Sequence, residues 1–138
     1  MPLQYGVKPR TILLCDYNLG GFKPPEMVKR RPAVVVTGLL PGRDRLHTVV
    51  PLSGTPSPDN CRYHCQVELA APLPEPFAET VWWAKCDMVA TVGFARLDLF
   101  QTKRDQYGKR KYLNDLRISD ENFAMIKQAL RHALSLLD

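Results

Sequence analysis

Long apolar runs are missing from this chain. Nowhere do eighteen apolar residues follow one another, and the N-terminal segment lacks a basic stretch leading into an apolar one. The first absence excludes a membrane-spanning helix, and the second argues against a secretory signal. Internal repeats and low-complexity segments are also lacking. We therefore expect a cytoplasmic protein that makes no contact with a membrane.

Cysteine is scarce, with four residues among 138. In a chain without a secretion signal, these are expected to be reduced thiols rather than a disulfide framework. A zinc site is the alternative, because Cys61, His64 and Cys65 lie within five residues and Cys86 could supply a fourth ligand. Structural zinc sites usually show two ligand pairs in turns, which this spacing does not match. We predict neither a bound metal nor a cofactor.

The rest of the composition is ordinary for a globular protein, with 45% hydrophobic and 24% charged residues. A chain of this length predicts a single domain over residues 1–138. Its charge is uneven, because residues 1–50 hold eight Lys and Arg against three Asp and Glu, which accounts for the whole net charge of +5. An electropositive half suits a polyanionic partner such as nucleic acid, although a solvated basic face would give the same pattern.

Short strands dominate the predicted secondary structure. Apolar segments between Gly- and Pro-rich stretches predict strands at residues 11–15, 31–37, 47–50, 63–69, 81–86 and 88–92. The strands at 31–37 and 47–50 flank a turn at 41–44 and should pair as an antiparallel hairpin. Residues 96–100 are predicted to form a short helical turn, and residues 106–112 a polar turn within a small hairpin.

One helix is predicted, at the end of the chain. Ser119 or Asp120 can cap its N-terminus. Apolar residues recur on one face at helical spacing: Phe123, Ile126, Leu130, Ala133, Leu134 and Leu137. This stripe must cover a sheet or a partner. Short strands followed by one amphipathic helix predict a mainly β fold with α, a small antiparallel barrel with the helix packed on one side.

Three consecutive cations, Lys29, Arg30 and Arg31, precede Pro32 and the apolar run 33–36. Proline lacks an N–H and belongs at the first residue of a strand, which places Arg31 at the rim of the sheet. An arginine at the rim can hold a phosphate with its planar fork of N–H groups. The alternative is a solvated cation at the end of a strand.

Residues 25–36, Pro-Glu-Met-Val-Lys-Arg-Arg-Pro-Ala-Val-Val-Val, resemble the start of the second main strand in MazF/PemK-type toxins of bacterial type II toxin–antitoxin systems. Residues 49–53 are similar to that family's strand ending in a hydroxyl residue, and residues 91–97 to a later element. The C-terminal helix fits as well, so the likeness runs in order from about residue 10 to residue 137. It implies an SH3-like barrel of the CcdB/MazF kind.

The resemblance implies a homodimeric ribonuclease that cuts single-stranded RNA at short sequences without a metal and is covered by a cognate antitoxin. In such cleavage the ribose 2′-OH attacks its own phosphate, so the protein supplies charge stabilisation and proton transfer. Arg31 matches the family's catalytic arginine and Ser53 its catalytic threonine or serine, while Glu26 stands where the family often has an acid. Ser53 could instead be a turn hydroxyl, and Glu26 an ordinary loop carboxylate.

Further residues are candidates for holding RNA: Lys23, Lys29, Arg30, Arg96, Tyr17 and Phe22. The cations could follow the RNA backbone, and the two rings could stack on bases. Arg96 could equally form an ion pair within the protein. His64 becomes a candidate acid–base group if its strand lies beside Ser53.

Two segments depart from the family's pattern. The loop at 17–30 is longer and richer in proline than in compact members, and residues 101–115 look inserted. Two other classes of function also remain open: a non-catalytic toxin that inhibits DNA gyrase, as in the CcdB branch of the fold, and a nucleic-acid-binding barrel without turnover. The CcdB branch lacks an arginine–hydroxyl pair, so Arg31 together with Ser53 favours the enzyme.

Overall fold

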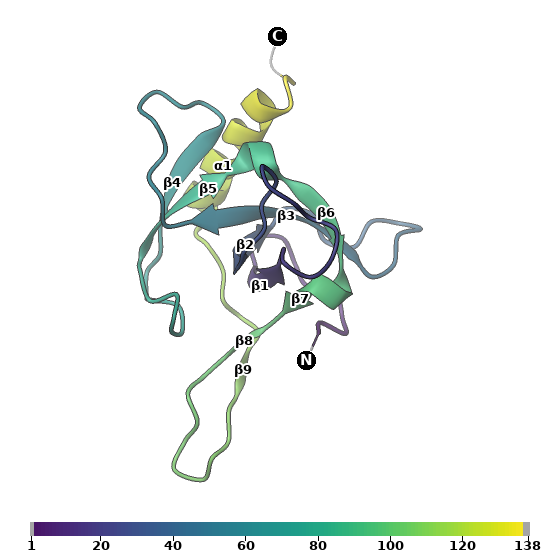
Figure 1. Ribbon diagram of the computed structural model, residues 1–138, viewed down its shortest axis with the longest axis vertical. Coiled ribbons are helices and arrows are strands. Elements are labelled where there is room, and N and C mark those ends of the chain that lie inside the picture. The colour runs from purple at the N-terminus through teal and green to yellow at the C-terminus, as the bar shows by residue number, and fades with distance from the viewer. Residues whose placement is uncertain (1, 137–138) are drawn as a thin grey trace.

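The computed structural model describes residues 2–136, in which seven strands form one bent sheet in the order β4-β5-β3-β2-β1-β7, with β6 paired to β3 (Figure 1). Neighbouring strands are antiparallel throughout. The strands are β1 (Ile12–Asp16), β2 (Arg30–Val35), β3 (Leu46–Ser53), β4 (His64–Glu68), β5 (Val81–Lys85), β6 (Ala90–Gly93) and β7 (Leu97–Asp98). A separate hairpin joins β8 (Phe100–Gln101) to β9 (Tyr112–Leu113), and the helix α1 spans Asp120–Ala133.

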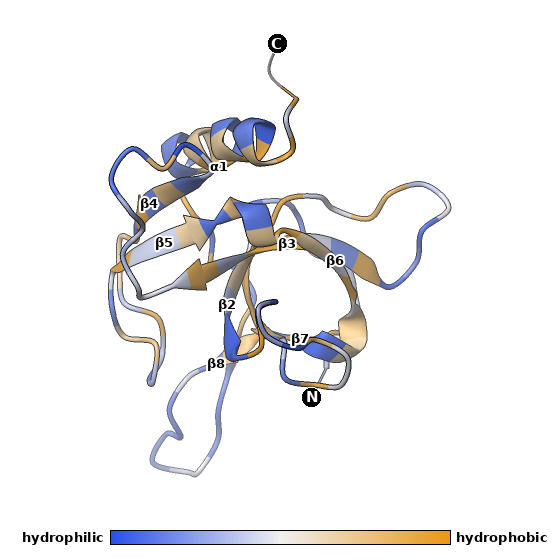
Figure 2. Ribbon diagram, turned by 45° about the horizontal axis from the view of Figure 1, so that its top comes forward, coloured by the Kyte–Doolittle hydropathy of each residue, from blue (hydrophilic) through white to orange (hydrophobic). Residues whose placement is uncertain are grey.

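Strand β2 is buried on both faces, as its run of valines predicts. Successive side chains of a strand point to opposite faces. Val34 enters a cluster with Leu52 and Trp82 that continues beneath α1, whereas Ala33 and Val35 enter a second cluster on the other face. Figure 2 shows β2, β3, β6 and β7 curling around a common centre, which this second cluster fills.

The helix α1 closes the first cluster. Ser119 caps it, since its Oγ accepts a hydrogen bond of 3.1 Å from the Asn122 backbone N–H. Ile126 and Ala129 are fully buried against the sheet. Leu134 lies beyond the helix and is exposed, so the predicted apolar stripe ends earlier than expected, and Leu137 lies outside the described residues.

The predicted fold class is confirmed, and the hairpin of β2 and β3 forms as expected. The helical turn predicted at residues 96–100 is wrong. A 3-10 helix, η2 (Phe94–Arg96), comes earlier, because Leu97 pairs with Cys15 of β1 and is buried in the second cluster. A second 3-10 helix, η1 (Cys86–Met88), delays the start of β6. Within residues 2–136 no helix combines the length and apolar character that a membrane crossing requires.

Candidate functional site

Arg31 and Ser53 lie at the point where two paired strands separate. The pairing of β2 with β3 places Ala33 opposite Pro51. Beyond this pair β2 continues along β1, with Arg31 opposite Cys15, while β3 turns to β5, with Ser53 opposite Trp83. Each candidate stands two residues beyond the last pair, so both occupy the same face of the sheet. The register thus places both residues predicted from the sequence on one face, at the neighbouring ends of β2 and β3.

Arg31 is a half-buried cation without a charged partner. No carboxylate of residues 2–136 forms an ion pair with it, and its Nε is buried without a hydrogen-bond partner among them. Burial lowers the pKa of the Arg31 guanidinium from its ordinary value. The buried side chain of Tyr17 is near enough to act electrostatically on this guanidinium. An unpaired cation at a strand end provides an electrostatic site for an anion.

Ser53 offers a hydroxyl with a free hydrogen. The residue is 7% exposed, and its Oγ accepts a hydrogen bond of 3.1 Å from the Thr55 backbone N–H. A hydroxyl has one donor and two acceptor positions, so this contact leaves the O–H available to donate. The turn after β3 therefore holds Ser53 in place without consuming its hydrogen.

Glu26 is not brought to Arg31. Its Oε1 accepts a hydrogen bond of 3.1 Å from the Lys23 backbone N–H, and its own N–H donates to the Lys23 carbonyl at 2.8 Å. These contacts close the turn at 23–26. The carboxylate is exposed and stabilises its own loop, which is the ordinary role that the sequence left open.

Tyr17, Phe22 and Arg96, three of the candidates for holding RNA, contact one another or the backbone in the loop after β1. Tyr17 is 0% exposed and packs edge-on against Phe22, with 5.6 Å between ring centroids. The prediction that Tyr17 stacks on a base is therefore wrong. Arg96 donates to the carbonyls of Asp16 and Gly20, and its guanidinium lies over the Phe22 ring. Within residues 2–136 Arg96 contacts backbone carbonyls and a ring rather than forming the ion pair considered from the sequence.

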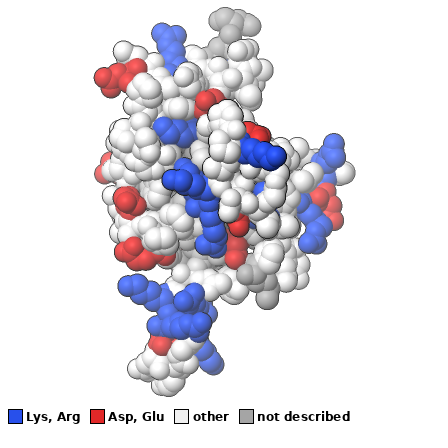
Figure 3. Space-filling view, viewed as in Figure 1, with Lys and Arg blue, Asp and Glu red and all other residues white. Residues whose placement is uncertain are grey.

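The remaining cations of this region are on the surface. Lys23, Lys29 and Arg30 are exposed, and Arg30 begins β2 opposite Asp16. Figure 3 shows Lys and Arg side chains across the middle of one face of the molecule, the face on which β2 lies in Figure 1. These positions fit contacts with a polyanion.

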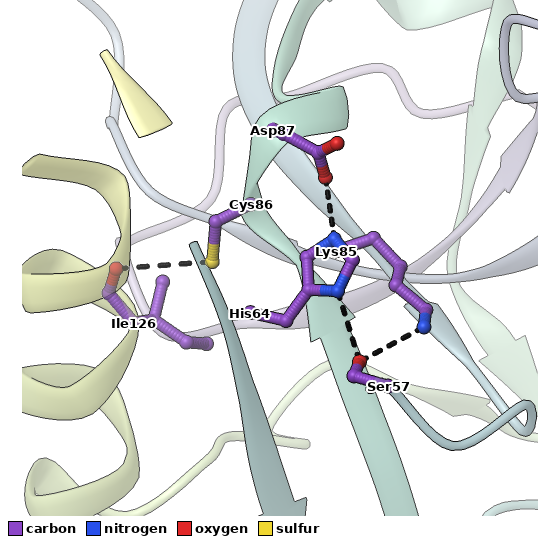
Figure 4. Close-up of polar contacts among 6 residues, drawn as sticks. All are labelled: Ser57, His64, Lys85, Cys86, Asp87 and Ile126. Carbon is purple, nitrogen blue, oxygen red and sulfur yellow. Dashed lines mark hydrogen bonds and ion pairs between the residues drawn. The ribbon is translucent and has the colours of Figure 1, made fainter. Parts of the chain in front are cut away.

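A polar network that the sequence did not predict lies on the same face of the sheet (Figure 4). His64 stands opposite Lys85 in the pairing of β4 with β5. Its Nδ1 is 2.9 Å from Ser57 Oγ, and its Nε2 is 2.6 Å from Asp87 Oδ1. The Lys85 ammonium donates to the same Ser57 Oγ at 2.9 Å. His64 is thus placed beside Ser57, and the contact with Ser53 that would have supported its acid–base role is not observed.

Lys85 connects this network to Arg31. Lys85 follows Trp83 by two residues in β5, so both side chains lie on the same face of the sheet. Ser53 of β3 pairs with Trp83 and therefore lies on that face too. Burial lowers the pKa of the Lys85 ammonium, and the positive charge of Arg31 acts in the same direction. Arg31 is therefore near enough for its charge to act on the Lys85 ammonium.

The thiols of Cys65 and Cys86 lie in the cluster beneath α1, on the other side of the sheet from this network. His64 and Cys65 are consecutive in β4 and point to opposite faces, with Cys65 on the side of α1. Among residues 2–136, no three His, Cys, Asp or Glu side chains gather so that they could hold a metal ion. All four cysteines are free thiols.

Comparison with known proteins places this arrangement in a family. The sequence model of the PemK-like, MazF-like toxins of type II toxin–antitoxin systems matches residues 8–134. The chain belongs to this toxin family. This MazF-like chain is also 34% identical to YifN, an uncharacterized protein of Escherichia coli (strain K12), over 159 aligned positions that cover 100% of both chains.

Solved structures share the fold of this MazF-like chain. An endoribonuclease from a mycobacterial species, solved with its cognate antitoxin, superposes with a TM-score of 0.61 at 17% identity, covering 95% of this chain and 97% of the other. MazF from Deinococcus radiodurans superposes with a TM-score of 0.61 at 14% identity, covering 96% of this chain and 99% of the other. A chain of the MazE–MazF complex from the same organism superposes with a TM-score of 0.55 at 15% identity, covering 95% of this chain and 97% of the other.

Proposed function

We propose that this protein is the toxin of a type II toxin–antitoxin pair and acts as a metal-independent, sequence-selective endoribonuclease on single-stranded RNA. One observation supports this best: Arg31, a half-buried cation that has no carboxylate partner among residues 2–136, stands at the end of β2 on the same face as the Ser53 hydroxyl at the end of β3. This pair can stabilise the negative charge that develops on a phosphate during cleavage.

In the proposed reaction the ribose 2′-oxygen attacks the adjacent phosphorus and the bond to the 5′-oxygen breaks. The products are a 2′,3′-cyclic phosphate and a 5′-hydroxyl. Arg31 holds two phosphoryl oxygens with its fork, and Ser53 donates its free hydrogen to a nonbridging oxygen. The lowered pKa of Arg31 makes it a better proton donor to the leaving 5′-oxygen.

The proton of the 2′-OH also needs an acceptor. Glu26, the candidate from the sequence, is engaged in the turn at 23–26. His64 shares the sheet face of Ser53, and its Nε2 contacts Asp87 while its Nδ1 contacts Ser57 Oγ, so it replaces Glu26 as our proposed base by taking the proton through the Ser57 hydroxyl. A carboxylate paired with a histidine orients the ring and stabilises the imidazolium that forms when the ring takes a proton.

The proposed partners follow from the same surface. Two of the solved relatives with this fold are bound to an antitoxin. We propose that a cognate antitoxin with an acidic segment covers the basic face of this protein, because opposite potentials favour that encounter. We further propose that the toxin is a single domain over residues 1–138 and works as a cytoplasmic homodimer.

The test incubates folded protein with long single-stranded RNA in excess EDTA and maps the new ends. Wild type should give discrete cuts with a 5′-hydroxyl and a 2′,3′-cyclic phosphate. Arg31→Ala should abolish the cuts, whereas Arg30→Ala, which removes the same charge from the exposed neighbour, should only weaken them. Intact RNA with folded wild type would exclude the enzyme, and a gyrase supercoiling assay would then test the non-catalytic alternative.

A further inference from the structure

The hairpin of β8 and β9 carries a concentration of positive charge far from Arg31 in the sequence. Its loop, residues 102–111, contains five cations and one acid. The exposed cations are Lys103, Arg104, Lys109, Arg110 and Lys111. Figure 1 shows the hairpin projecting from the body of the molecule, and Figure 3 shows Lys and Arg side chains gathered on it.

The hairpin is ordered by its own hydrogen bonds rather than by packing on the body. The Thr102 backbone N–H donates to the Lys111 carbonyl at 2.9 Å, and the Lys111 N–H donates to Thr102 Oγ1 at 2.9 Å. At the tip, Asp105 Oδ1 accepts from the N–H groups of Tyr107 and Lys109 at 2.8 and 2.9 Å. The single carboxylate of the loop is therefore turned to its backbone, while the cations face solvent.

The base of the hairpin reaches Arg30, the exposed cation that precedes Arg31 in β2. Arg110 lines a cavity of about 180 Å³ together with Arg30, the residue next to Arg31. Two acids, Glu75 and Asp98, line the same cavity. In Figure 3 the hairpin and the cations across the middle of the molecule lie on one face. Arg30 points to the face of β2 opposite Arg31, so a strand of RNA that passes from Arg31 around the end of β2 would meet Arg30 and then Arg110.

We propose that this hairpin binds the sugar–phosphate backbone of the RNA on one flank of the cleavage site. Five like charges on a ten-residue ordered loop repel one another, and a polyanion relieves this repulsion by taking the place of counterions. Tyr107 at the tip is 77% exposed and gives a base a ring on which to stack. The inference rests on the proposed function for the identity of the nucleic acid.

The experiment compares two variants that lose the same charge. One is the triple variant Lys109→Gln, Arg110→Gln and Lys111→Gln, which leaves Asp105 and the Arg104 contact with the Gly108 carbonyl intact. The control is Lys8→Gln, Lys127→Gln and Arg131→Gln, three exposed cations outside the hairpin. Both are made in the Arg31→Ala background, so that RNA is bound without being cut. Fluorescence anisotropy follows RNAs of about six and about thirty nucleotides, within and beyond the reach of one binding groove.

For the long RNA, the hairpin variant should bind about five- to tenfold more weakly than the control, and the slope of log K against log salt should fall by up to about 2. The short RNA should bind both variants equally. Equal binding of the long RNA would overturn the proposal. Polyglutamate is tested in the same way as an acidic polypeptide. If the hairpin variant loses affinity for polyglutamate alone, the proposal is also overturned, because the hairpin would then bind a protein partner.

The same proteins with Arg31 restored separate this inference from the enzyme proposal. If the wild type cuts RNA and the hairpin variant binds the long RNA as tightly as the control, the hairpin proposal alone is contradicted. Hairpin-dependent binding of the long RNA without any cleavage by wild type would contradict the enzyme alone. A single substitution, Tyr107→Ala, should weaken binding of the long RNA by about fivefold or more if a base stacks at the tip.

Discussion

Nε2 of His64 lies 2.6 Å from Oδ1 of Asp87, in a hydrogen bond that joins β4 to the 3-10 helix after β5. The imidazole is largely buried while the carboxylate is partly exposed. Because the other ring nitrogen contacts Ser57, both edges of the ring are fixed. The orientation of His64 therefore depends on two residues that come from different segments of the chain.

Removing the charge of Asp87 should impair the reaction more than the fold. With Asp87→Asn, His64 loses the carboxylate that orients it and stabilises its charged form, so kcat should fall about tenfold or more. Glu68→Gln is the matched control, because it removes one exposed carboxylate from the same face of β4. Cleavage assays and thermal unfolding of both variants provide the measurement. Equal kcat for Asp87→Asn and Glu68→Gln would remove His64 from the mechanism.

Arg31 should be more important for activity than for stability. Its Nε is buried without an acceptor in the described part of the chain, so replacing it by an apolar side chain of similar length removes a desolvated polar group. Arg31→Met should keep or slightly raise the free energy of unfolding in urea, within about 1 kcal/mol of wild type. RNA cleavage should nevertheless be lost.

Arg31→Lys tests whether charge alone is enough. Lysine retains the positive charge but cannot hold two phosphoryl oxygens with a planar fork. Its cleavage rate should fall by about a hundredfold, near the loss from one missing oxyanion donor. Wild-type rates with lysine would show that the site needs only a point charge, and strong destabilisation by methionine would show that Arg31 supports the fold.

The positions of Arg31 and Ser53 could be predicted because both depend on local patterns. A valine run after Pro32, a turn at 41–44 and a second apolar strand together predict a hairpin, and its antiparallel register brings the ends of the two strands together. The network around His64 could not be predicted in this way. Ser57 lies in a loop and Asp87 follows another strand, so their meeting depends on the β4–β5 register and on how the loop folds back.

The burial of Tyr17 could have been predicted from the alternating pattern of β1, although the residues after it have the composition of a loop. Leu13, Cys15 and Tyr17 all enter the second cluster, so the alternation of β1 continues one residue past the end of the strand. The Gly- and Pro-rich residues that follow made Tyr17 resemble a solvent-facing loop residue. Arg96 was likewise unpredictable in role, because its acceptors are backbone carbonyls, which carry no side-chain signature.

Buried thiols should react more slowly than those near the surface. Burial raises the pKa of Cys15 to about 11. The hydrogen bond between Cys65 and Cys86 lowers the pKa of Cys65 and raises that of Cys86, whose burial acts in the same direction. Iodoacetamide at neutral pH should therefore label Cys65 before Cys15 and Cys86 in the native protein. Mass spectrometry of tryptic peptides measures the order, and early labelling of Cys15 would contradict the burial of β1.

His47 should make the fold less stable in mild acid. The ring is 1% exposed, Nε2 accepts from the Val7 N–H at 3.1 Å, and Nδ1 donates to the Thr37 carbonyl at 3.0 Å. Burial lowers its pKa in the folded protein, against about 6.5 in the unfolded chain. As the pH falls through about 6.5, the unfolded chain takes up a proton that the folded protein resists, so the free energy of unfolding decreases.

Urea unfolding between about pH 8 and pH 5 measures this loss, because the stabilising contribution is complete above the unfolded pKa and declines below it. His47→Gln removes the titrating ring and should flatten the pH dependence over this range, although it lowers stability at neutral pH. His132→Gln, on the last turn of α1, is the matched control and should keep the wild-type slope. An unchanged slope in His47→Gln would assign the acid sensitivity to other groups and leave the His47 contacts with Val7 and Thr37 as purely structural.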